Sequence, residues 1–136
     1  MHIIIGGAHN GKRDYVSTML VGREVEWRDV AVGGASHSHS SNTIQTIVVT
    51  GIEKWLAETA LSEVEAIDFV MDIVVSPNTI VILTDIGRGI VPIDAQQRQL
   101  RDTCGRLYQR LIVEADEVTR IWYGLAQTLK KRGEVL

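Results

Sequence analysis

A glycine-rich segment near the start of the chain carries the residue types of a phosphate-binding loop. Residues 6–12 have the sequence Gly6-Gly7-Ala8-His9-Asn10-Gly11-Lys12, which fits the pattern G-x-x-x-x-G-K. Glycines let successive backbone N–H groups turn toward a phosphate, the amino end of a following helix adds positive potential, and the lysine neutralises the outer phosphates. The alternative interpretation is an ordinary glycine-rich turn with an exposed lysine. The pattern favours phosphate binding.

The usual oxygen ligands of a magnesium ion are not at their usual places. The residue after the loop lysine is Arg13, which adds positive charge but cannot ligate a cation as a Ser or Thr hydroxyl would. An acidic residue is also expected at the end of a neighbouring strand. The strand that ends at Thr50 lacks one, whereas Asp85 follows the next strand and is either that residue or an ordinary loop carboxylate or helix cap. These departures predict weak or altered Mg²⁺-dependent catalysis, and no resident metal site is expected.

Three histidines and the single cysteine are the other candidates for chemistry. His9 lies within the loop and either touches phosphate or points to water. His37 and His39 lie in the Gly/Ser-rich segment 33–42, which predicts a mobile loop. They are a candidate nucleophile or metal pair, but histidines in such a segment are far more often only solvated. Cys104 falls on the apolar stripe of a predicted helix and is expected to be inert core.

Alternating strands and helices must position these residues. Apolar β-type runs predict strands at 2–5, 44–49, 79–83 and 117–123, and a half-exposed strand around 25–28 at an edge of the sheet. Helices are predicted at 13–20, at 51–60, after the capping box Ser62-x-x-Glu65 and after Asp94. This alternation predicts a three-layer α/β fold, with a mostly parallel sheet and helices on both faces. Ligands of such sheets bind at the carboxyl ends of the strands.

Length and composition limit the class of protein. The 136 residues, 45% hydrophobic and 23% charged, predict a single folded domain over 1–136. The net charge of -3 argues against a nucleic-acid partner. No apolar stretch approaches the roughly 20 residues that span a bilayer, so no membrane partner is expected. One cysteine excludes an internal disulfide and, with no signal-peptide pattern, predicts a cytoplasmic protein.

The C-terminal half resembles a known family. Its segments are Thr84-Asp85-Ile86-Gly87-Arg88-Gly89-Ile90-Val91-Pro92, then Arg101-Asp102-Thr103-Cys104-Gly105-Arg106-Leu107-Tyr108-Gln109-Arg110-Leu111, then Ala115-Asp116-Glu117-Val118. They resemble the N-E-V-G-x-G-I-V-P, F-R-D-x-A-G-R-x-N-Q-x-L-A and A-D-E-V motifs of the adenosylcobinamide kinase / adenosylcobinamide-phosphate guanylyltransferase family. The loop at 6–12 is similar to the family's G-G-x-x-S-G-K-S, and residues 47–57 to its D-C-L-T-x-W-L segment. The resemblance covers most of the chain.

The resemblance implies a P-loop NTPase-like domain that assembles as a homotrimer. The family uses ATP or GTP to phosphorylate adenosylcobinamide, a corrinoid, and then transfers GMP from GTP through a guanylylated histidine, late in adenosylcobalamin (vitamin B12) biosynthesis. For this chain it implies nucleotide binding by residues 6–13 and a transferase in which Lys12 and Asp85 are catalytic. It also implies substrate or subunit contacts at Gly87, Gly89, Pro92, Arg101 and Asp102.

Several departures from the family pattern leave more than one function open. Arg13 replaces the family's Ser, Thr50 its middle-strand Asp, Thr84-Asp85 its Asn-Glu pair and Tyr108 its Asn. Material before Trp27 that carries the family's guanylylated histidine is absent as well. One hypothesis is a shortened enzyme of this kind, with guanylyl transfer the activity least supported. A second is a degenerate nucleotide-binding or regulatory module without guanylyltransferase activity, or without either activity. A structural trimer subunit is the third, and the intact loop argues against it.

Overall fold

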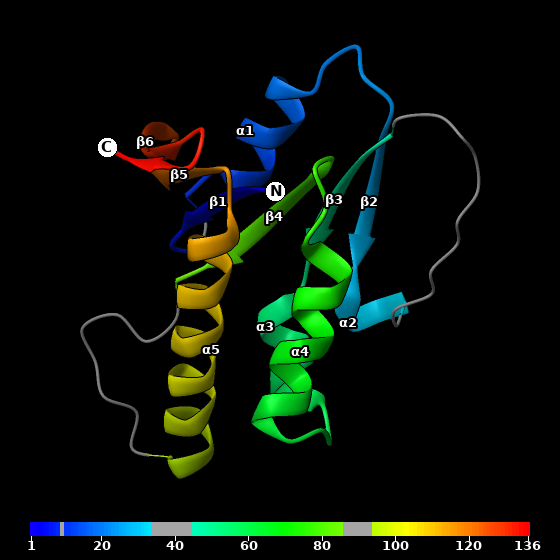
Figure 1. Cartoon of the computed structure of the whole chain (residues 1–136), viewed down its shortest axis with the longest axis vertical. Coiled ribbons are helices and arrows are strands. Elements are labelled where there is room, and N and C mark those ends of the chain that lie inside the picture. Colours follow the sequence, from blue (N-terminus) through cyan, green and yellow to red (C-terminus); the bar gives the residue numbers. More distant parts are fainter. Residues whose placement is uncertain (9, 34–44, 86–93) are drawn as a thin grey trace.

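A central sheet dominates the computed structural model, which describes residues 1–8, 10–33, 45–85 and 94–136 (Figure 1). Across these residues the strand order is β2-β3-β4-β1-β5-β6-β7. Five strands are parallel, namely β1 (His2–Gly6), β2 (Val25–Asp29), β3 (Thr46–Thr50), β4 (Thr79–Thr84) and β5 (Glu117–Trp122). Two more, β6 (Leu125–Lys131) and β7 (Glu134–Val135), extend the sheet in antiparallel hairpins.

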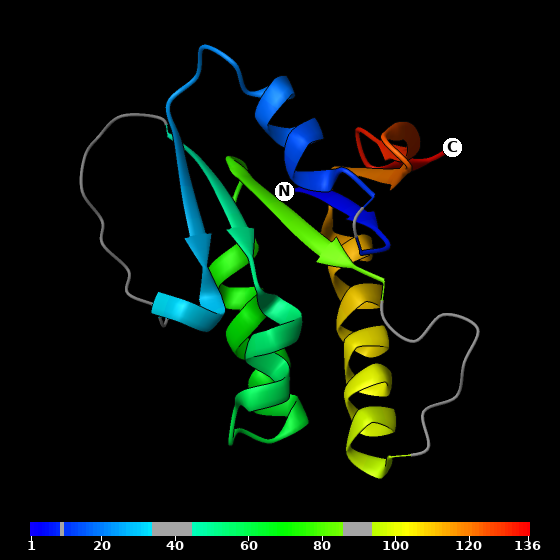
Figure 2. The same cartoon turned by 180° about the vertical axis from the view of Figure 1, so that it is seen from behind.

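Helices cover both faces of the sheet, as Figures 1 and 2 show from opposite sides. They are α1 (Lys12–Met19), α2 (Val30–Gly33), α3 (Ile52–Glu58), α4 (Glu63–Val74) and α5 (Ala95–Glu114). Successive side chains of a strand point to opposite faces. Thus Ile4 packs with Val16 of α1, whereas Ile3 packs with the cluster formed by α3, α4 and α5. The three-layer α/β fold with a mostly parallel sheet is confirmed.

The order of the strands creates a crevice between β1 and β4. After β1 the chain crosses to β2 through α1 on one face, whereas after β4 it crosses to β5 through α5 on the other face. Neighbouring parallel strands whose connections leave in opposite directions form a switch point, where α/β proteins bind ligands. The glycine-rich loop follows β1 and Asp85 follows β4, so both border this crevice.

Local sequence signals account for most element boundaries. The capping box is present at the start of α4, where the Ser62 side chain accepts a hydrogen bond from the Glu65 N–H. Asp94 caps α5 by accepting from the Gln96 N–H at 2.7 Å. The strand at 25–29 is an edge strand of the sheet, as predicted. The short α2 and the hairpins of β6 and β7 were not expected. Four residues are too few to show a helical spacing in α2, and β6 and β7 carry no apolar run.

Within the described residues, no helix is long and apolar enough to cross a membrane.

Candidate functional site

The glycine-rich loop runs between the ends of β4 and β5. The Gly6 carbonyl accepts a hydrogen bond from the Asp85 N–H at 2.9 Å, and the Asn10 carbonyl accepts one from the Gly124 N–H at 2.9 Å. A Cβ on Gly6 would lie 2.3 Å from the Ile121 carbonyl oxygen, so only glycine fits there. Gly11 precedes α1 with φ +86°, a conformation that glycine adopts without strain. The loop is therefore fixed on both sides by main-chain contacts.

A cavity of about 610 Å³ opens beside this loop, at the carboxyl ends of β3 and β4. One wall is the loop with the first turn of α1, and the other walls are the end of β3, the start of α3 and the end of β4. The lining side chains and backbone belong to Ala8, Asn10, Gly11, Lys12, Arg13, Asp14, Thr50, Gly51, Glu53, Ile82 and Thr84. Residues as far apart in the sequence as positions 8 and 84 thus meet at the crevice that the sheet topology creates.

Lys12 is a buried lysine, only 8% exposed, at the wall of this cavity. Its Nζ donates to the carbonyl oxygens of Gly6 at 3.2 Å and Gly7 at 2.6 Å. An ammonium group has three N–H donors, so one remains for an anion in the cavity. Burial lowers the pKa of Lys12, and the Glu53 and Asp85 carboxylates oppose that shift. The result is a positioned cation beside the loop.

The amino end of α1 adds further donors for an anion. Its N-cap, Gly11, has no side chain, and no side-chain hydrogen bond caps the helix. The first N–H groups of a helix have no partner within the helix, and they carry the positive end of its dipole. Together with Lys12 they form the kind of site in which helix N-termini bind phosphate.

Glu53 is a functional candidate that the sequence interpretation missed. It lies in the first turn of α3, three residues after β3 ends at Thr50, and lines the cavity. Its Oε1 accepts hydrogen bonds from the Thr84 N–H at 2.5 Å and the Tyr108 hydroxyl at 2.8 Å, which orients the carboxylate. The same hydroxyl lies 2.7 Å from the Thr84 carbonyl oxygen. Its position just beyond the end of a strand was the available signal.

Tyr108 supports this carboxylate from α5. Its side chain is buried, and burial raises the pKa of its hydroxyl above the ordinary value, with Glu53 adding to the shift. The hydroxyl therefore stays protonated and acts as a donor. Tyr108 is also one of the departures from the family pattern, and in this chain it contacts Glu53.

Arg13 lines the cavity without blocking it. Its guanidinium carbon lies 5.5 Å from the centroid of the Trp27 ring on β2, in a cation–π contact. The side chain is exposed, and such a contact at an exposed site is worth roughly 0.5–1 kcal/mol, which an anion can outcompete. Arg13 therefore supplies a second positive charge at the wall facing β2.

The structure places the remaining predicted residues as follows. Asp85 directly follows β4 and acts on the pKa of Lys12, so it belongs to the same region. Arg101 and Asp102 lie on α5, where an exposed ion pair joins them at 3.4 Å. Neither lines the cavity beside the loop among the described residues. Outside the described residues lie His9, His37, His39, Gly87, Gly89 and Pro92.

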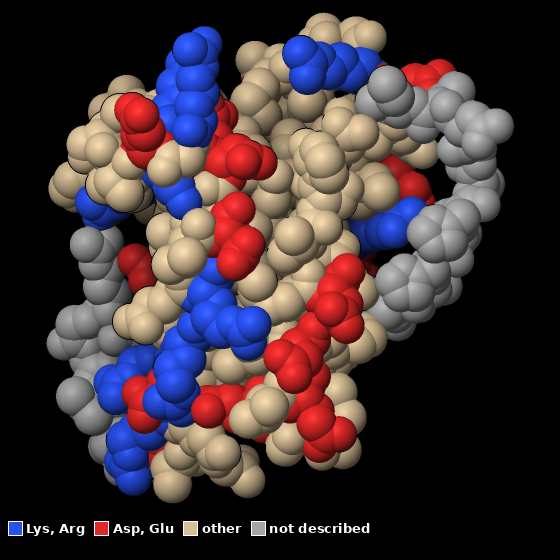
Figure 3. All heavy atoms as spheres, in the orientation of Figure 1, with Lys and Arg blue, Asp and Glu red and all other residues tan. Residues whose placement is uncertain are grey.

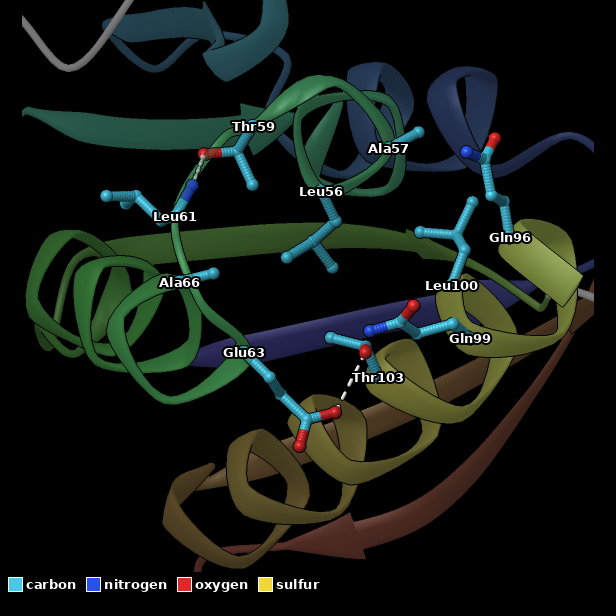
Figure 4. Close-up of a pocket in the computed structure, with 10 residues that line it drawn as sticks. All are labelled: Leu56, Ala57, Thr59, Leu61, Glu63, Ala66, Gln96, Gln99, Leu100 and Thr103. Carbon is cyan, nitrogen blue, oxygen red and sulfur yellow. Dashed lines mark hydrogen bonds between the residues drawn. The ribbon is translucent and has the colours of Figure 1, made fainter.

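A second cavity, of about 320 Å³, lies between α5 and the α3–α4 pair (Figure 4). Its lining combines apolar and polar side chains, namely Leu56, Ala57, Thr59, Leu61, Glu63, Ala66, Gln96, Gln99, Leu100 and Thr103. Hydrogen bonds from Arg106 and Thr103 lower the pKa of Glu63, so its carboxylate is charged and already paired. Among the described residues the lining contains no lysine or arginine, so this part of the cavity does not suit phosphate.

Charged side chains beside this second cavity also form ion pairs with one another. Figure 3 shows basic side chains gathered over α5 and acidic ones over α4. Across the two helices Arg106 pairs with Glu63 at 2.5 Å and Arg110 with Asp68 at 3.4 Å. Exposed pairs of this kind contribute little free energy. The arginines of α5 are thus accounted for by contacts within the chain rather than by an anion site.

Among the described residues, a Mg²⁺ ion that arrives bound to a nucleotide would find a suitable carboxylate. These residues do not form a set of ligands that could hold the ion by themselves. No group of three or more His, Cys, Asp or Glu side chains among them is arranged to hold a metal ion. Mg²⁺ bound with a nucleotide keeps several waters and needs only one or two protein carboxylates. Glu53 fits that requirement, because Oε1 is anchored while the residue lines the cavity.

Comparison with known proteins identifies the family. The model of the cobinamide kinase / cobinamide phosphate guanyltransferase family matches residues 21–129, and the chain therefore belongs to this family. The match confirms the resemblance found in the sequence, and it begins after the glycine-rich loop. A solved structure from a structural study of Pyrococcus horikoshii OT3 has a TM-score of 0.54 at 7% identity, covering 100% of this chain and 91% of that one. At this identity the likeness concerns the fold alone. No curated protein matches the chain.

Proposed function

We propose that this member of the cobinamide kinase / cobinamide phosphate guanyltransferase family binds ATP or GTP at the loop of residues 6–13 and transfers the terminal phosphoryl group to a corrinoid of the cobinamide class. The observation that carries the proposal is the buried Lys12 ammonium. It is held on the Gly6 and Gly7 carbonyls, and Lys12 lines a cavity beside the end of α1 that no side chain caps. Family membership supports the substrate class.

The proposed reaction relies on positioning and charge. The bond between the bridging oxygen and the terminal phosphorus breaks, and a nucleoside diphosphate leaves. The acceptor hydroxyl oxygen bonds to that phosphorus and releases its proton to water. Lys12 stabilises the charge that develops on the transferred group, and Arg13 adds a second cation on release from Trp27. Glu53 and Asp85 are the acidic residues that would hold the water shell of a nucleotide-borne Mg²⁺, which when bound would neutralise phosphate charge.

Guanylyl transfer is not part of this proposal. That reaction needs a histidine nucleophile. The only histidine among the described residues is His2 on β1, which contacts Thr119 at 2.9 Å and Glu117 at 2.9 Å. His2 lies at the amino end of β1, whereas the loop follows its carboxyl end. The second candidate function is a nucleotide-binding or regulatory module without catalysis. The absence of a Ser or Thr after Lys12 and of an acid at position 50 favours that candidate.

The deciding experiment is calorimetric titration of the chain with ATP and GTP, with and without Mg²⁺, followed by an assay for nucleotide turnover with cobinamide. If the chain is an enzyme, the assay should show Mg²⁺-dependent turnover that yields phosphorylated cobinamide. Tight nucleotide binding without turnover would instead support the nucleotide-binding or regulatory module. Lys12→Ala should abolish binding in either case, and unchanged affinity in that variant would refute the site itself. Lys54→Ala, an exposed lysine on α3, is the matched control.

We further propose that the chain is one domain over 1–136 and functions in the cytoplasm as a homotrimer. The trimer rests on the family resemblance. The mass of the assembly by light scattering tests it directly, and a monomer at working concentration would contradict it.

A further inference from the structure

The turn between β5 and β6 lies directly against the phosphate loop. Gly6 and Ile121 are the last residues that pair between the parallel strands β1 and β5. The loop after Gly6 and the end of β5 at Trp122 therefore leave the sheet side by side. Two residues later the Gly124 N–H donates to the Asn10 carbonyl at 2.9 Å, and a Cβ on Gly11 would lie 3.6 Å from the Gly124 Cα. Loop and turn are therefore held as one unit by their main chains.

This turn carries two aromatic side chains that the fold does not bury. Trp122 is 57% exposed and Tyr123 is 78% exposed, and their ring centroids lie 6.1 Å apart. The Arg120 guanidinium lies over the Trp122 ring at 5.3 Å, so one face of that ring is covered. No cation lies over the Tyr123 ring in the part of the chain that the structure describes. Large exposed aromatic groups on a fixed turn are costly to solubility and commonly mark a binding surface.

The position of the turn complements the cavity. The cavity lies on the β3 and β4 side of the loop, and its lining contains Lys12, Arg13 and Glu53 but no aromatic residue among those described. The turn lies on the β5 side of the same loop. A nucleotide whose terminal phosphates enter the cavity needs a place for its base, and flat aromatic rings are the groups on which bases stack.

We propose that Tyr123 forms the nucleobase subsite of this nucleotide site, with its ring stacked on the base and Trp122 supporting it. The inference rests on the proposed nucleotide binding and adds the recognition of the base. Stacking requires only a π face, so the subsite accepts adenine and guanine alike. The positive charge of Arg120 beside the rings adds attraction for the anionic ligand.

The test compares ATP and GTP with inorganic tripolyphosphate, which has the phosphates and lacks the base. Calorimetry on the full chain should show tighter binding of both nucleotides than of tripolyphosphate. Tyr123→Ala should weaken nucleotide binding by roughly tenfold, the usual order for loss of one base–aromatic stack, and leave tripolyphosphate binding unchanged. Tyr123→Phe keeps the ring and should bind like the parent chain. Leu125→Ala, a 75% exposed apolar residue on the same hairpin, is the matched control and should change none of the three.

Three results would overturn the inference. Tripolyphosphate that binds as tightly as ATP shows that no base subsite exists. Equal losses for all three ligands in Tyr123→Ala show a structural effect of the turn. A change in the mass of the assembly in Tyr123→Ala and Leu125→Ala, with nucleotide preference intact, assigns the aromatic surface to contacts between copies of the chain. If the parent chain binds none of the three ligands, the proposed function falls together with the subsite.

Discussion

Lys12 and Glu53 line the same cavity and carry opposite charges. Burial lowers the pKa of the Lys12 ammonium, and the Glu53 carboxylate is the charge that opposes this shift most. The two residues come from the first turns of α1 and α3. The cation proposed to hold phosphate and the carboxylate proposed to hold metal-bound water are thus brought together by two separate β–α connections, one after β1 and one after β3.

The first prediction concerns Glu53→Gln. The amide oxygen still accepts from the Thr84 N–H and the Tyr108 hydroxyl, so the fold should be retained. Removing the negative charge should tighten metal-free ATP binding by roughly fivefold, because unit charges about 4 Å apart in water interact by about 1 kcal/mol. The gain in affinity on adding Mg²⁺ should largely disappear. Titration calorimetry with and without Mg²⁺ measures both effects.

Glu58→Gln on the same helix is the control for this substitution. Glu58 is exposed at the other end of α3 and does not line the cavity. Its neutral variant should bind ATP like the parent chain in both conditions. An equal response of the two variants would mean that net charge alone is at work, and Glu53 would then have no local role.

The second prediction concerns pH. In the proposed site Lys12 would bind phosphate only while protonated, and burial lowers its pKa below the ordinary value of about 10.4. Affinity for tripolyphosphate should therefore fall as pH rises, beginning at a lower pH than an exposed lysine would require. The Lys12→Arg variant keeps its charge throughout and should bind with little dependence on pH over the same range. A parent chain whose affinity stays constant up to the ordinary lysine pKa would contradict the assignment.

The same pKa shift has a consequence for stability. A lysine whose pKa is lowered by folding binds its proton more tightly in the unfolded chain. Lys12 therefore makes the folded state less stable at neutral pH, and this cost disappears as pH rises through the lowered pKa toward the unfolded value. Lys12→Met should remove the cost, so the variant should be at least as stable as the parent chain at pH 7 while losing phosphate binding.

The third prediction concerns two glycines. A Cβ on Gly6 would lie 2.3 Å from the Ile121 carbonyl oxygen, so Gly6→Ala forces β1 and β5 apart and should lower the free energy of unfolding by about 1–3 kcal/mol. Gly105 lies within α5, with nothing within 4 Å of an added Cβ. Gly105→Ala should raise stability by about 0.5–1 kcal/mol through helix propensity. Urea denaturation of both variants measures the difference, and equal effects would contradict the close approach of β5 to the loop.

The fourth prediction concerns Cys104. Its side chain is 2% exposed, and burial with the Glu53 charge raises the pKa of the thiol to about 12. The thiolate is the reactive form, so Cys104 should resist a thiol reagent at pH 8 and react only as fast as the chain unfolds. The rate of labelling of Cys104, monitored by absorbance with and without urea, checks this. Rapid labelling of the native chain would show that the α5 packing is looser than described.

Much of the architecture follows from local patterns. The apolar runs at 2–5 and 79–83, the helical stripe around Leu107 and the capping box at Ser62 each identify an element, because burial on a helix or strand face leaves a regular spacing in the sequence. The hairpins of β6 and β7 have no such spacing. Most of β6 is exposed. Its two turns have Tyr123-Gly124 and Arg132-Gly133 at positive φ, so the glycine of the usual hairpin signal is present but its Asn or Asp is not.

The site divides in the same way. The glycine pattern and Lys12 could be proposed as a phosphate site from the chain alone, since a phosphate loop is made of consecutive residues whose backbone does the binding. Asp85 was also a candidate from the sequence, whereas Glu53 was not. Asp85 and Glu53 both follow strands. Which of them enters the cavity depends on the strand order β3-β4-β1 and on Tyr108 reaching Glu53 from α5. Sequence spacing specifies contacts within a segment, whereas contacts between distant segments are decided only when the sheet order brings the strand ends together.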